Sequence, residues 1–299
     1  MSACATFARL PLVRHRSKGR YAARPAPKST EGSISGHFCY TRRVPGVSVV
    51  IITKDEAANL EAALASAAWA DERIVVDAGS ADGTVEIARR MADRVEVRGW
   101  PGYGAQKDYA ASIATHDWIL SLDADERVPP ELAAEIQALV AAGPSAAGYR
   151  VGRLVWFLGR WIRSTDWYPD YQLRLYDRRR ARWSDRLVHE SVRVEGPVGT
   201  LRHVLHHFTY RDLAHQVDTI QRYTTLGAAQ MARDGRRARA VDLALQPAAA
   251  FARNYVLRRG FTDGAAGFVV SLMNAYAVFL KFAKLWELGR SPGWRPPTP

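Results

Sequence analysis

Residues 118–126 read WILSLDADE, and this stretch decides the fold. Its uncharged, mostly apolar first half is typical of a buried β-strand that runs directly into Asp123. Asp123 and Asp125 are two positions apart, so a turn here would bring both carboxylates to one side. Carboxylate oxygens suit Mg²⁺ and Mn²⁺, which keep positions open for phosphate oxygens. The stretch therefore predicts a metal site at a strand end, with a solvated turn as the alternative.

Two earlier runs have the same form. Residues 47–52 read VSVVII and are followed by Thr53, and residues 73–76 read RIVV and are followed by Asp77. Segments with helical spacing separate the runs, so that strands recur about every 20–25 residues. This alternation predicts a parallel sheet with crossover helices. Because ligands bind at the carboxyl ends of the strands in such sheets, we expect Thr53, Asp77 and Asp123 at one crevice.

The 299-residue chain carries a formal net charge of +12, and most of this charge lies in residues 1–46. That segment has nine Arg or Lys residues, one acidic residue and no apolar periodicity, so we expect a disordered basic extension. It has no apolar run of secretory length. The two cysteines of the sequence give neither a disulfide framework nor a zinc spacing. The remaining chain is only mildly basic, which argues against nucleic-acid binding as the main function.

Three stretches, in this order, are similar to a known enzyme family. They are residues 48–56 (SVVIITKDE), residues 74–84 (IVVDAGSADGT) and residues 118–126, and together they resemble family 2 glycosyltransferases of the GT-A fold. The closer resemblance is to lipopolysaccharide core β-1,4-glucosyltransferases, and it covers about residues 47–288. Asp108 departs from the family pattern, in which Asn is more frequent. Four further stretches resemble the same family: residues 102–107 (GYGAQK), 167–175 (WYPDYQLRL), 187–190 (LVHE) and 260–264 (GFTDG).

The resemblance implies a Rossmann-like GT-A domain that takes a sugar from a nucleotide-sugar, with UDP-glucose as the best guess for the donor. The turn from Thr53 to Glu56 and the carboxylate of Asp77 would hold the nucleoside. Lys107 would lie near the nucleotide. Two alternatives stay open: Thr53 and Asp77 could merely cap helices, and Lys107 could be a solvated surface charge.

The resemblance also implies the residues around the diphosphate. Asp123 would face the ribose or the metal, and Asp125 would bind a Mg²⁺ or Mn²⁺ ion that bridges the diphosphate. Arg174 could contact the diphosphate or an acidic acceptor. His189 could be a third metal ligand or a phosphate contact, and its alternative is a hydrogen-bonded structural histidine.

An inverting transfer needs a base that takes the proton from the acceptor hydroxyl. Among the carboxylates that follow the metal motif, we favour Asp170 and Glu190. Asp170 lies in an aromatic frame of Trp167, Tyr168 and Tyr171, where partial desolvation would increase its basicity. The sequence does not rank Asp170 against Glu190.

The helical part near the C-terminus indicates whether the protein associates with a membrane. Residues 265–280 carry no charge, and these 16 residues are short of the roughly 20 needed to span a bilayer. Phe268, Leu272, Tyr276 and Phe279 instead recur at helical spacing near Lys, Arg and Trp residues, as in helices that lie in the membrane interface. Packing onto the catalytic domain or a partner is the alternative. We expect an enzyme held peripherally on the inner face of the cytoplasmic membrane, acting on a lipid-linked saccharide.

These assignments divide the chain into segments and leave two rival functions. Transfer to polyprenyl phosphate or to a protein would keep the same chemistry. A basic nucleic-acid-binding protein with an α/β domain is the rival from another class, and it predicts salt-sensitive binding to DNA or RNA. The expected segments are the extension over 1–46, the GT-A domain over 47–210 (nucleotide-sugar half about 47–126, acceptor half about 127–210), a helical region over 211–290 and a Pro-rich tail over 291–299.

Overall fold

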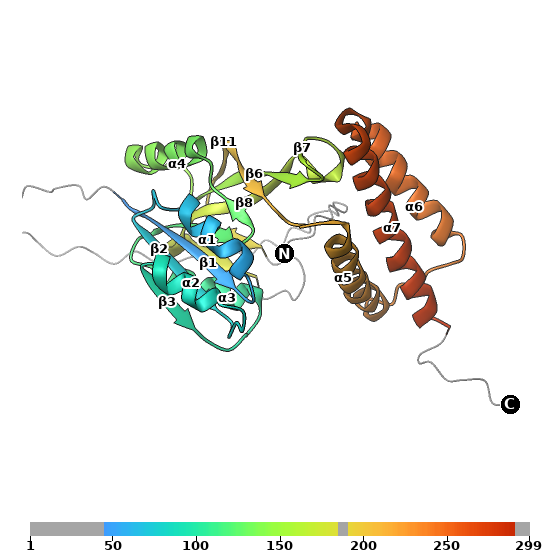
Figure 1. Ribbon diagram of the computed structural model, residues 1–299, viewed down its shortest axis with the longest axis horizontal. Helices are drawn as coiled ribbons and strands as arrows, with labels where there is room; N and C mark the ends of the chain where they lie inside the picture. Colours follow the sequence, from blue (N-terminus) through green and yellow to red (C-terminus); the bar gives the residue numbers. More distant parts are fainter. Residues whose placement is uncertain (1–44, 185–190, 291–299) are drawn as a thin grey trace, which may run out of the picture. The chain divides into compact units, whose positions relative to one another are not determined.

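The structure, a computed structural model, describes residues 45–184 and 191–290. Its first part alternates strands with helices, as the sequence predicts. The elements of this part are β1 (Val47–Thr53), α1 (Ala57–Ser66), β2 (Glu72–Asp77), α2 (Thr84–Met91), β3 (Arg94–Val97), α3 (Tyr103–Ser112) and β4 (Trp118–Asp123). All four strands are parallel neighbours in one sheet, in the order β3-β2-β1-β4 (Figure 1).

After β4 the chain changes to mixed pairing. The elements of this part are β5 (Glu126–Arg127), α4 (Pro130–Ala142), β6 (Gly148–Phe157), β7 (Arg160–Ile162), η1 (Thr165–Trp167), β8 (Asp170–Asp177), η2 (Arg178–Arg180), β9 (Ala181–Trp183), β10 (Val192–Val194) and β11 (Val198–His207). β8 pairs antiparallel with β4 and extends the same sheet through β6, β11 and β5. The sheet therefore changes from parallel to antiparallel pairing between β4 and β8. As a result, the carboxyl end of β4 lies next to residues that follow β4 in the sequence.

The register of the parallel strands brings their polar ends together. Thr53 of β1 lies opposite Asp77 of β2, and Ile52 of β1 lies opposite Asp123 of β4. The three polar residues that follow the apolar runs therefore share one edge of the sheet, as the sequence predicts.

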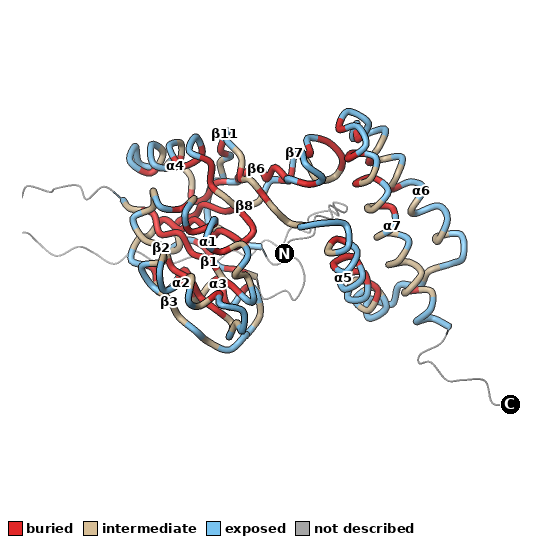
Figure 2. The backbone as a smooth tube through the Cα atoms, in the orientation of Figure 1, coloured by how far each residue is buried: buried red, intermediate tan, exposed pale blue. Residues whose placement is uncertain are grey.

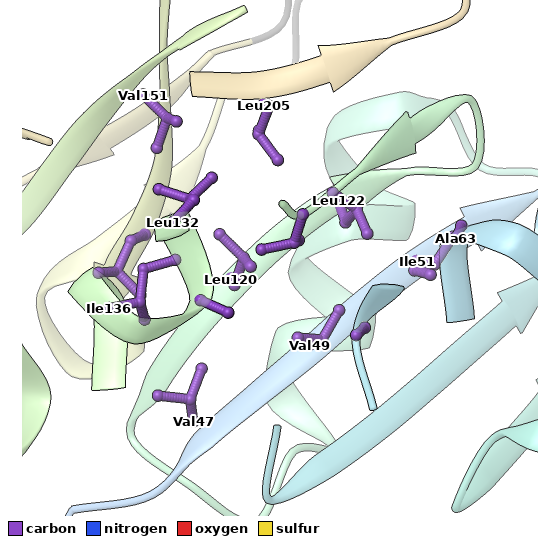
Figure 3. Close-up of a cluster of buried hydrophobic side chains, with 14 of the residues drawn as sticks. Val47, Val49, Ile51, Ala63, Leu120, Leu122, Leu132, Ile136, Val151 and Leu205 are labelled. Carbon is purple, nitrogen blue, oxygen red and sulfur yellow. The ribbon is translucent and has the colours of Figure 1, made fainter. Parts of the chain in front are cut away.

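Both faces of the parallel strands are buried. Side chains alternate between faces along a strand, so Val49 and Ile51 of β1 join one apolar cluster and Val50 joins another. The first cluster includes residues of α1, α4 and β11, and ten of its side chains are labelled in Figure 3. The second cluster includes Ala110 and Ala111 of α3. Helices on both faces explain why these strands have apolar residues at nearly every position (Figure 2).

The chain ends in helices, as expected for residues 211–290. They are α5 (Leu213–Arg233), α6 (Asp242–Ala252), η3 (Arg253–Leu257), η4 (Gly260–Asp263) and α7 (Gly264–Leu288). α7 packs against both α5 and α6. A Cβ atom on Gly267 would lie 1.9 Å from the carbonyl oxygen of Gly260, so the start of α7 can approach η4 only because residue 267 is glycine.

The apolar helical region is longer than the uncharged run in the sequence. Residues Gly260–Leu288 form a segment of 29 residues that is long and apolar enough to cross a membrane, by length and composition alone. The buried core helix of a soluble protein can meet the same criterion. The tail expected over 291–299 lies outside the described residues, as does the basic extension except for its last two positions.

Candidate active site

Asp123 and Asp125 follow one another at the end of β4, and the structure gives them different partners. Asp123 Oδ1 accepts a hydrogen bond from Lys107 Nζ at 3.1 Å, and Oδ2 pairs with Arg174. Lys107 comes from α3 and Arg174 from β8. Burial alone would raise the pKa of Asp123, but the charges of Arg174 and Lys107 hold this pKa well below its usual range. Both oxygens of this ionised carboxylate are thus engaged by cations.

A buried chain of alternating charges continues from Asp123. Glu126 Oε2 accepts the backbone N–H of Asp123 at 3.0 Å, and Oε1 accepts from Arg174 at 2.5 Å. The same Oε1 lies 3.5 Å from Arg153 Nη1. The side chains of Arg153 and Glu126 are 1% and 0% exposed, so the cost of removing each charge from water is offset by its charged neighbours.

Asp170 closes this chain of charges. Arg153 Nε donates to Asp170 Oδ2 at 2.8 Å, and Gln172 Nε2 donates to Oδ1 at 2.7 Å. Arg153 and Asp170 are register partners on the antiparallel strands β6 and β8. We expected aromatic neighbours to surround this carboxylate. The structure shows that an arginine from the neighbouring strand binds it, and the adjacent Tyr171 is 52% exposed.

Asp125 has a histidine as its partner. Its Oδ2 lies 3.1 Å from His207 Nε2, and both side chains are buried. The backbone explains the contact: β5 and β11 pair antiparallel, with Glu126 opposite His207. Burial would raise the pKa of Asp125, but the contact with His207 holds this pKa well below its usual range. The Thr209 hydroxyl lies 2.7 Å from the same ring nitrogen.

Glu56 belongs to the surroundings of Asp125. Burial raises the pKa of Glu56, a hydrogen bond from Asn59 Nδ2 at 2.9 Å opposes this, and the negative charge of Asp125 raises the pKa further. Arg127 also lies beside this turn, with Nη1 donating to the carbonyl oxygen of Ala124 at 2.8 Å. The last residue of the predicted nucleoside turn thus lies within electrostatic reach of the metal motif.

Thr53 and Asp77 hold the turn after β2. The Asp77 carboxylate accepts from Thr53 Oγ1 at 2.8 Å, and from the backbone N–H groups of Gly79 and Ser80 at 2.8 and 2.7 Å. Neither Thr53 nor Asp77 caps a helix, so that alternative was wrong. Asp82 is the residue that binds helix starts, because it accepts the backbone N–H groups of Ala57 and Thr84, the first residues of α1 and α2.

A small pocket adjoins the chain of charges. Lys107 lies in this pocket with its Nζ 4.6 Å from the centre of the Trp183 ring, so it is not a solvated surface charge. Asp108 accepts the backbone N–H of Trp183 at 3.0 Å, a bond that the carbonyl oxygen of an asparagine could also accept. The residues that line the pocket are Lys107, Asp123, Gln172, Leu173, Arg174, Trp183, Ser191 and Val192.

The donor set for a divalent cation is small. In residues 45–184 and 191–290, no group of three or more His, Cys, Asp or Glu side chains is arranged to hold a metal. Asp125 and His207 offer one carboxylate and one imidazole within 3.1 Å of each other. The carboxylate suits Mg²⁺ or Mn²⁺, whereas an imidazole is a poor ligand for Mg²⁺, and two donors would leave coordination positions for phosphate oxygens. Asp123 fits this role less well, because its oxygens bind Lys107 and Arg174.

The structure brings most of the predicted residues to one edge of the sheet. Lys107, Asp123 and Arg174 are in direct contact, whereas His189 and Glu190 lie outside the described residues. The sequence analysis missed three residues of this region: Glu126, Arg153 and His207. His207 had a detectable signal, since residues 206–210 read HHFTY, with two consecutive histidines.

Known proteins resemble this chain over most of its length. The family described as glycosyl transferase family 2 matches residues 48–199. An uncharacterized glycosyltransferase of Rickettsia typhi is 32% identical over 255 residues, which cover 81% of this chain and 87% of the relative. The lipopolysaccharide core biosynthesis glycosyltransferase LpsC of Rhizobium meliloti is 31% identical over 248 residues, which cover 81% of this chain and 92% of LpsC.

Solved structures match a smaller part. A glucosyl-3-phosphoglycerate synthase from Mycobacterium tuberculosis matches 36% of this chain and 44% of its own, at 23% identity and a TM-score of 0.33. The sequence relatives are matched over nearly their whole length, and the family match covers the parallel strands and the aspartate motif. The fold is GT-A, and the chain is a glycosyltransferase that belongs to glycosyl transferase family 2.

Proposed function

We propose that this glycosyltransferase moves a sugar, with inversion, from a nucleotide-sugar to a lipid-linked saccharide at the inner face of the cytoplasmic membrane. Lipopolysaccharide core is the best candidate acceptor, because LpsC is named for the biosynthesis of that core. UDP-glucose stays the best guess for the donor. The observation that carries the proposal is the pairing of Asp123 with two cations and of Asp125 with His207 at one strand end.

The leaving group of this reaction is a nucleoside diphosphate, whose negative charge increases in the transition state. Asp125 and His207 would hold a Mg²⁺ or Mn²⁺ ion, which when bound would neutralise part of this charge. Lys107 and Arg174 are buried cations on the other side of the motif, and Asp123 keeps both in place. Their positive charges would stabilise the departing diphosphate in addition to the metal ion.

The nucleoside half of the donor would bind at the ends of β1 and β2. Asp77 fixes the turn there by binding Thr53 and two backbone N–H groups, which gives a rigid surface next to the motif. Glu56 is close enough to Asp125 for their charges to interact. Positioning of the donor along this edge would supply much of the rate enhancement.

The acceptor hydroxyl needs a base, and Asp170 and Glu190 stay the candidates. Asp170 is bound to Arg153, which also contacts Glu126 beside the metal motif. An acceptor-side carboxylate is therefore connected to the donor side by one buried arginine. We propose parallel tests of Asp170→Asn and Glu190→Gln. The variant that keeps donor binding and loses transfer identifies the base, and full transfer by both removes both from this role.

The test of the proposed function is a screen of nucleotide-sugars by nucleotide release, with and without Mg²⁺ or Mn²⁺. We expect one donor class to be turned over, and Asp125→Ala to lose well over tenfold in rate. Asp218→Ala is the matched control, because Asp218 is exposed on α5. An Asp125→Ala rate equal to that of the control would remove Asp125 from the mechanism.

A further inference from the structure

Exposed apolar side chains are concentrated near the C-terminus. Twenty large apolar side chains are exposed in the described part of the chain, and ten of them lie in residues 241–288. Leu257 is the most exposed of these, at 76%. A contiguous apolar surface of this kind marks an interaction site, whereas single exposed apolar residues need no explanation.

Ring contacts show that part of this surface is continuous. Tyr255 lies 5.4 Å from Phe251, 6.3 Å from Phe261 and 5.7 Å from Phe268, measured between ring centres. Phe261 and Phe268 are 50% and 45% exposed. This aromatic cluster connects α6, η3, η4 and α7 into one surface.

The surface continues along one side of α7. Phe268, Leu272, Tyr276 and Phe279 recur at helical spacing, and each is at least 38% exposed. We call this side of α7, together with the aromatic cluster and Leu257, the apolar face. It has no counterpart in α5, where three exposed large apolar residues are interspersed with charged ones.

The opposite side of α7 is bound to the protein by polar contacts. Asn274 donates to Asn254 Oδ1 at 2.8 Å and accepts from Trp167 Nε1 at 3.3 Å. Lys284 Nζ donates to the carbonyl oxygen of Gln221 and the hydroxyl of Thr224 on α5, both at 2.8 Å. A membrane-spanning α7 would carry these groups, and the charged α5, into hydrocarbon. The contacts therefore favour a helix that lies along a membrane over one that crosses it.

Charge indicates what covers the apolar face. Residues 251–268, which include the aromatic cluster, contain three Arg residues and one acidic residue, Asp263, which is buried. Arg258 and Arg259 are exposed and lie between Leu257 and Phe261. A positively charged border around an apolar surface is complementary to anionic headgroups above acyl chains.

We propose that the apolar face docks on an anionic lipid surface, with α7 lying in the plane of the membrane. This inference deepens the proposed peripheral location, and it names the surface and its orientation. Vesicle binding is measured without sugar transfer, so failure of one proposal is distinguishable from failure of the other.

The test is flotation of the full chain with vesicles of phosphatidylcholine alone or mixed with phosphatidylglycerol. We expect binding to the mixed vesicles, weakened by salt and released by alkaline carbonate. Phe268→Glu combined with Leu272→Glu should weaken binding at least tenfold with an unchanged melting temperature. Leu226→Glu is the matched control, because Leu226 is 54% exposed on α5, and it should bind like the unmodified chain. Arg259→Gln should reduce the dependence on salt.

Three results would overturn the proposal. The first is equal flotation of the double variant and the control, or no flotation of the unmodified chain. The second is retention after carbonate, which would mean that α7 spans the membrane. The third is a dimer in solution that the double substitution separates, which would make a second copy of the chain the occupant. If the double variant melts at a lower temperature, Tyr276→Glu provides the same comparison at a single position.

Discussion

The carboxylate of Asp125 and the imidazole of His207 lie 3.1 Å apart, although 82 residues separate them in the sequence. The contact depends on one short antiparallel pairing, in which β11 runs beside β5 and sets His207 opposite Glu126. The geometry of the candidate metal site is therefore set by backbone register.

Removal of His207 should weaken metal binding more than folding. We expect His207→Ala to lower the affinity for Mn²⁺ by about 10- to 100-fold, because a ligand or its close partner is lost. The measurement is the shift in melting temperature on addition of Mn²⁺ with a nucleoside diphosphate. His203→Ala is the control, since His203 lies on the same strand and binds Glu135 at the surface. An unchanged Mn²⁺ effect in His207→Ala would exclude His207 from the site.

Arg153 should be among the most costly residues to remove. Arg153→Met leaves the charges of Glu126 and Asp170 buried without this partner, and we expect a loss of about 3–5 kcal/mol in the free energy of unfolding. Urea titration at neutral pH measures the loss. Arg239→Ala should cost below about 1 kcal/mol, because the side chain of Arg239 is 81% exposed beside Asp242. Similar losses for the two variants would contradict the buried chain of charges.

Substitution of Gln106, in contrast to that of Arg153, should increase the free energy of unfolding. Its side chain is fully buried on α3, and neither amide atom has a hydrogen-bond partner within the described residues. Gln106→Met keeps the shape and removes the buried amide, so we expect a gain of about 1–3 kcal/mol in the free energy of unfolding. Gln137→Met on the exposed side of α4 should change stability little. A clear loss of stability in Gln106→Met would mean that the amide is hydrogen-bonded in solution.

Glu135 should make stability depend on acid pH. Burial would raise its pKa, but hydrogen bonds from the backbone N–H groups of Arg202 and His203, and from the His203 ring, hold the pKa below its ordinary value of 4.5. The stabilisation is therefore fully present above pH 4.5 and is lost as the pH falls through the folded-state pKa. The unmodified chain should therefore be more stable than Glu135→Gln at pH 7, and this difference in the free energy of unfolding should be smaller at pH 4. Urea titrations at the two pH values measure the difference.

The control for this pH dependence is Glu131→Gln, which changes an exposed carboxylate on the same helix. Its stability should follow that of the unmodified chain at both pH values. A difference between Glu135→Gln and the unmodified chain that stays constant from pH 7 to pH 4 would contradict the assignment.

The sheet and its polar edge could be predicted because both depend on local patterns. Apolar runs that end in Thr53, Asp77 and Asp123 identify buried parallel strands, and parallel strands bring their carboxyl ends together. The helices α1 and α2 agree with the segments of helical spacing that separate the apolar runs. The resemblance to the family also identified Asp123 and Asp125, beside the strand pattern.

The partners of these residues could not be predicted, since they depend on pairing between distant strands. Arg153 is one of two arginines in the otherwise apolar segment RVGRLVWF, where a positive charge suggests an exposed position. It is buried because β6 and β8 pair in a register that sets it opposite Asp170. The link from His207 to Asp125 likewise depends on β5, a strand of two residues that no periodicity can indicate.

The late position of β11 also has a consequence for the order in which the protein is made. Both aspartates leave the ribosome long before His207, so a nascent chain has the acidic motif without its histidine. A fragment cut where the family match ends, at residue 199, would keep that motif and lose the same partner. The capacity to bind a cation would thus be acquired only after β11 has been synthesised, well after the parallel strands.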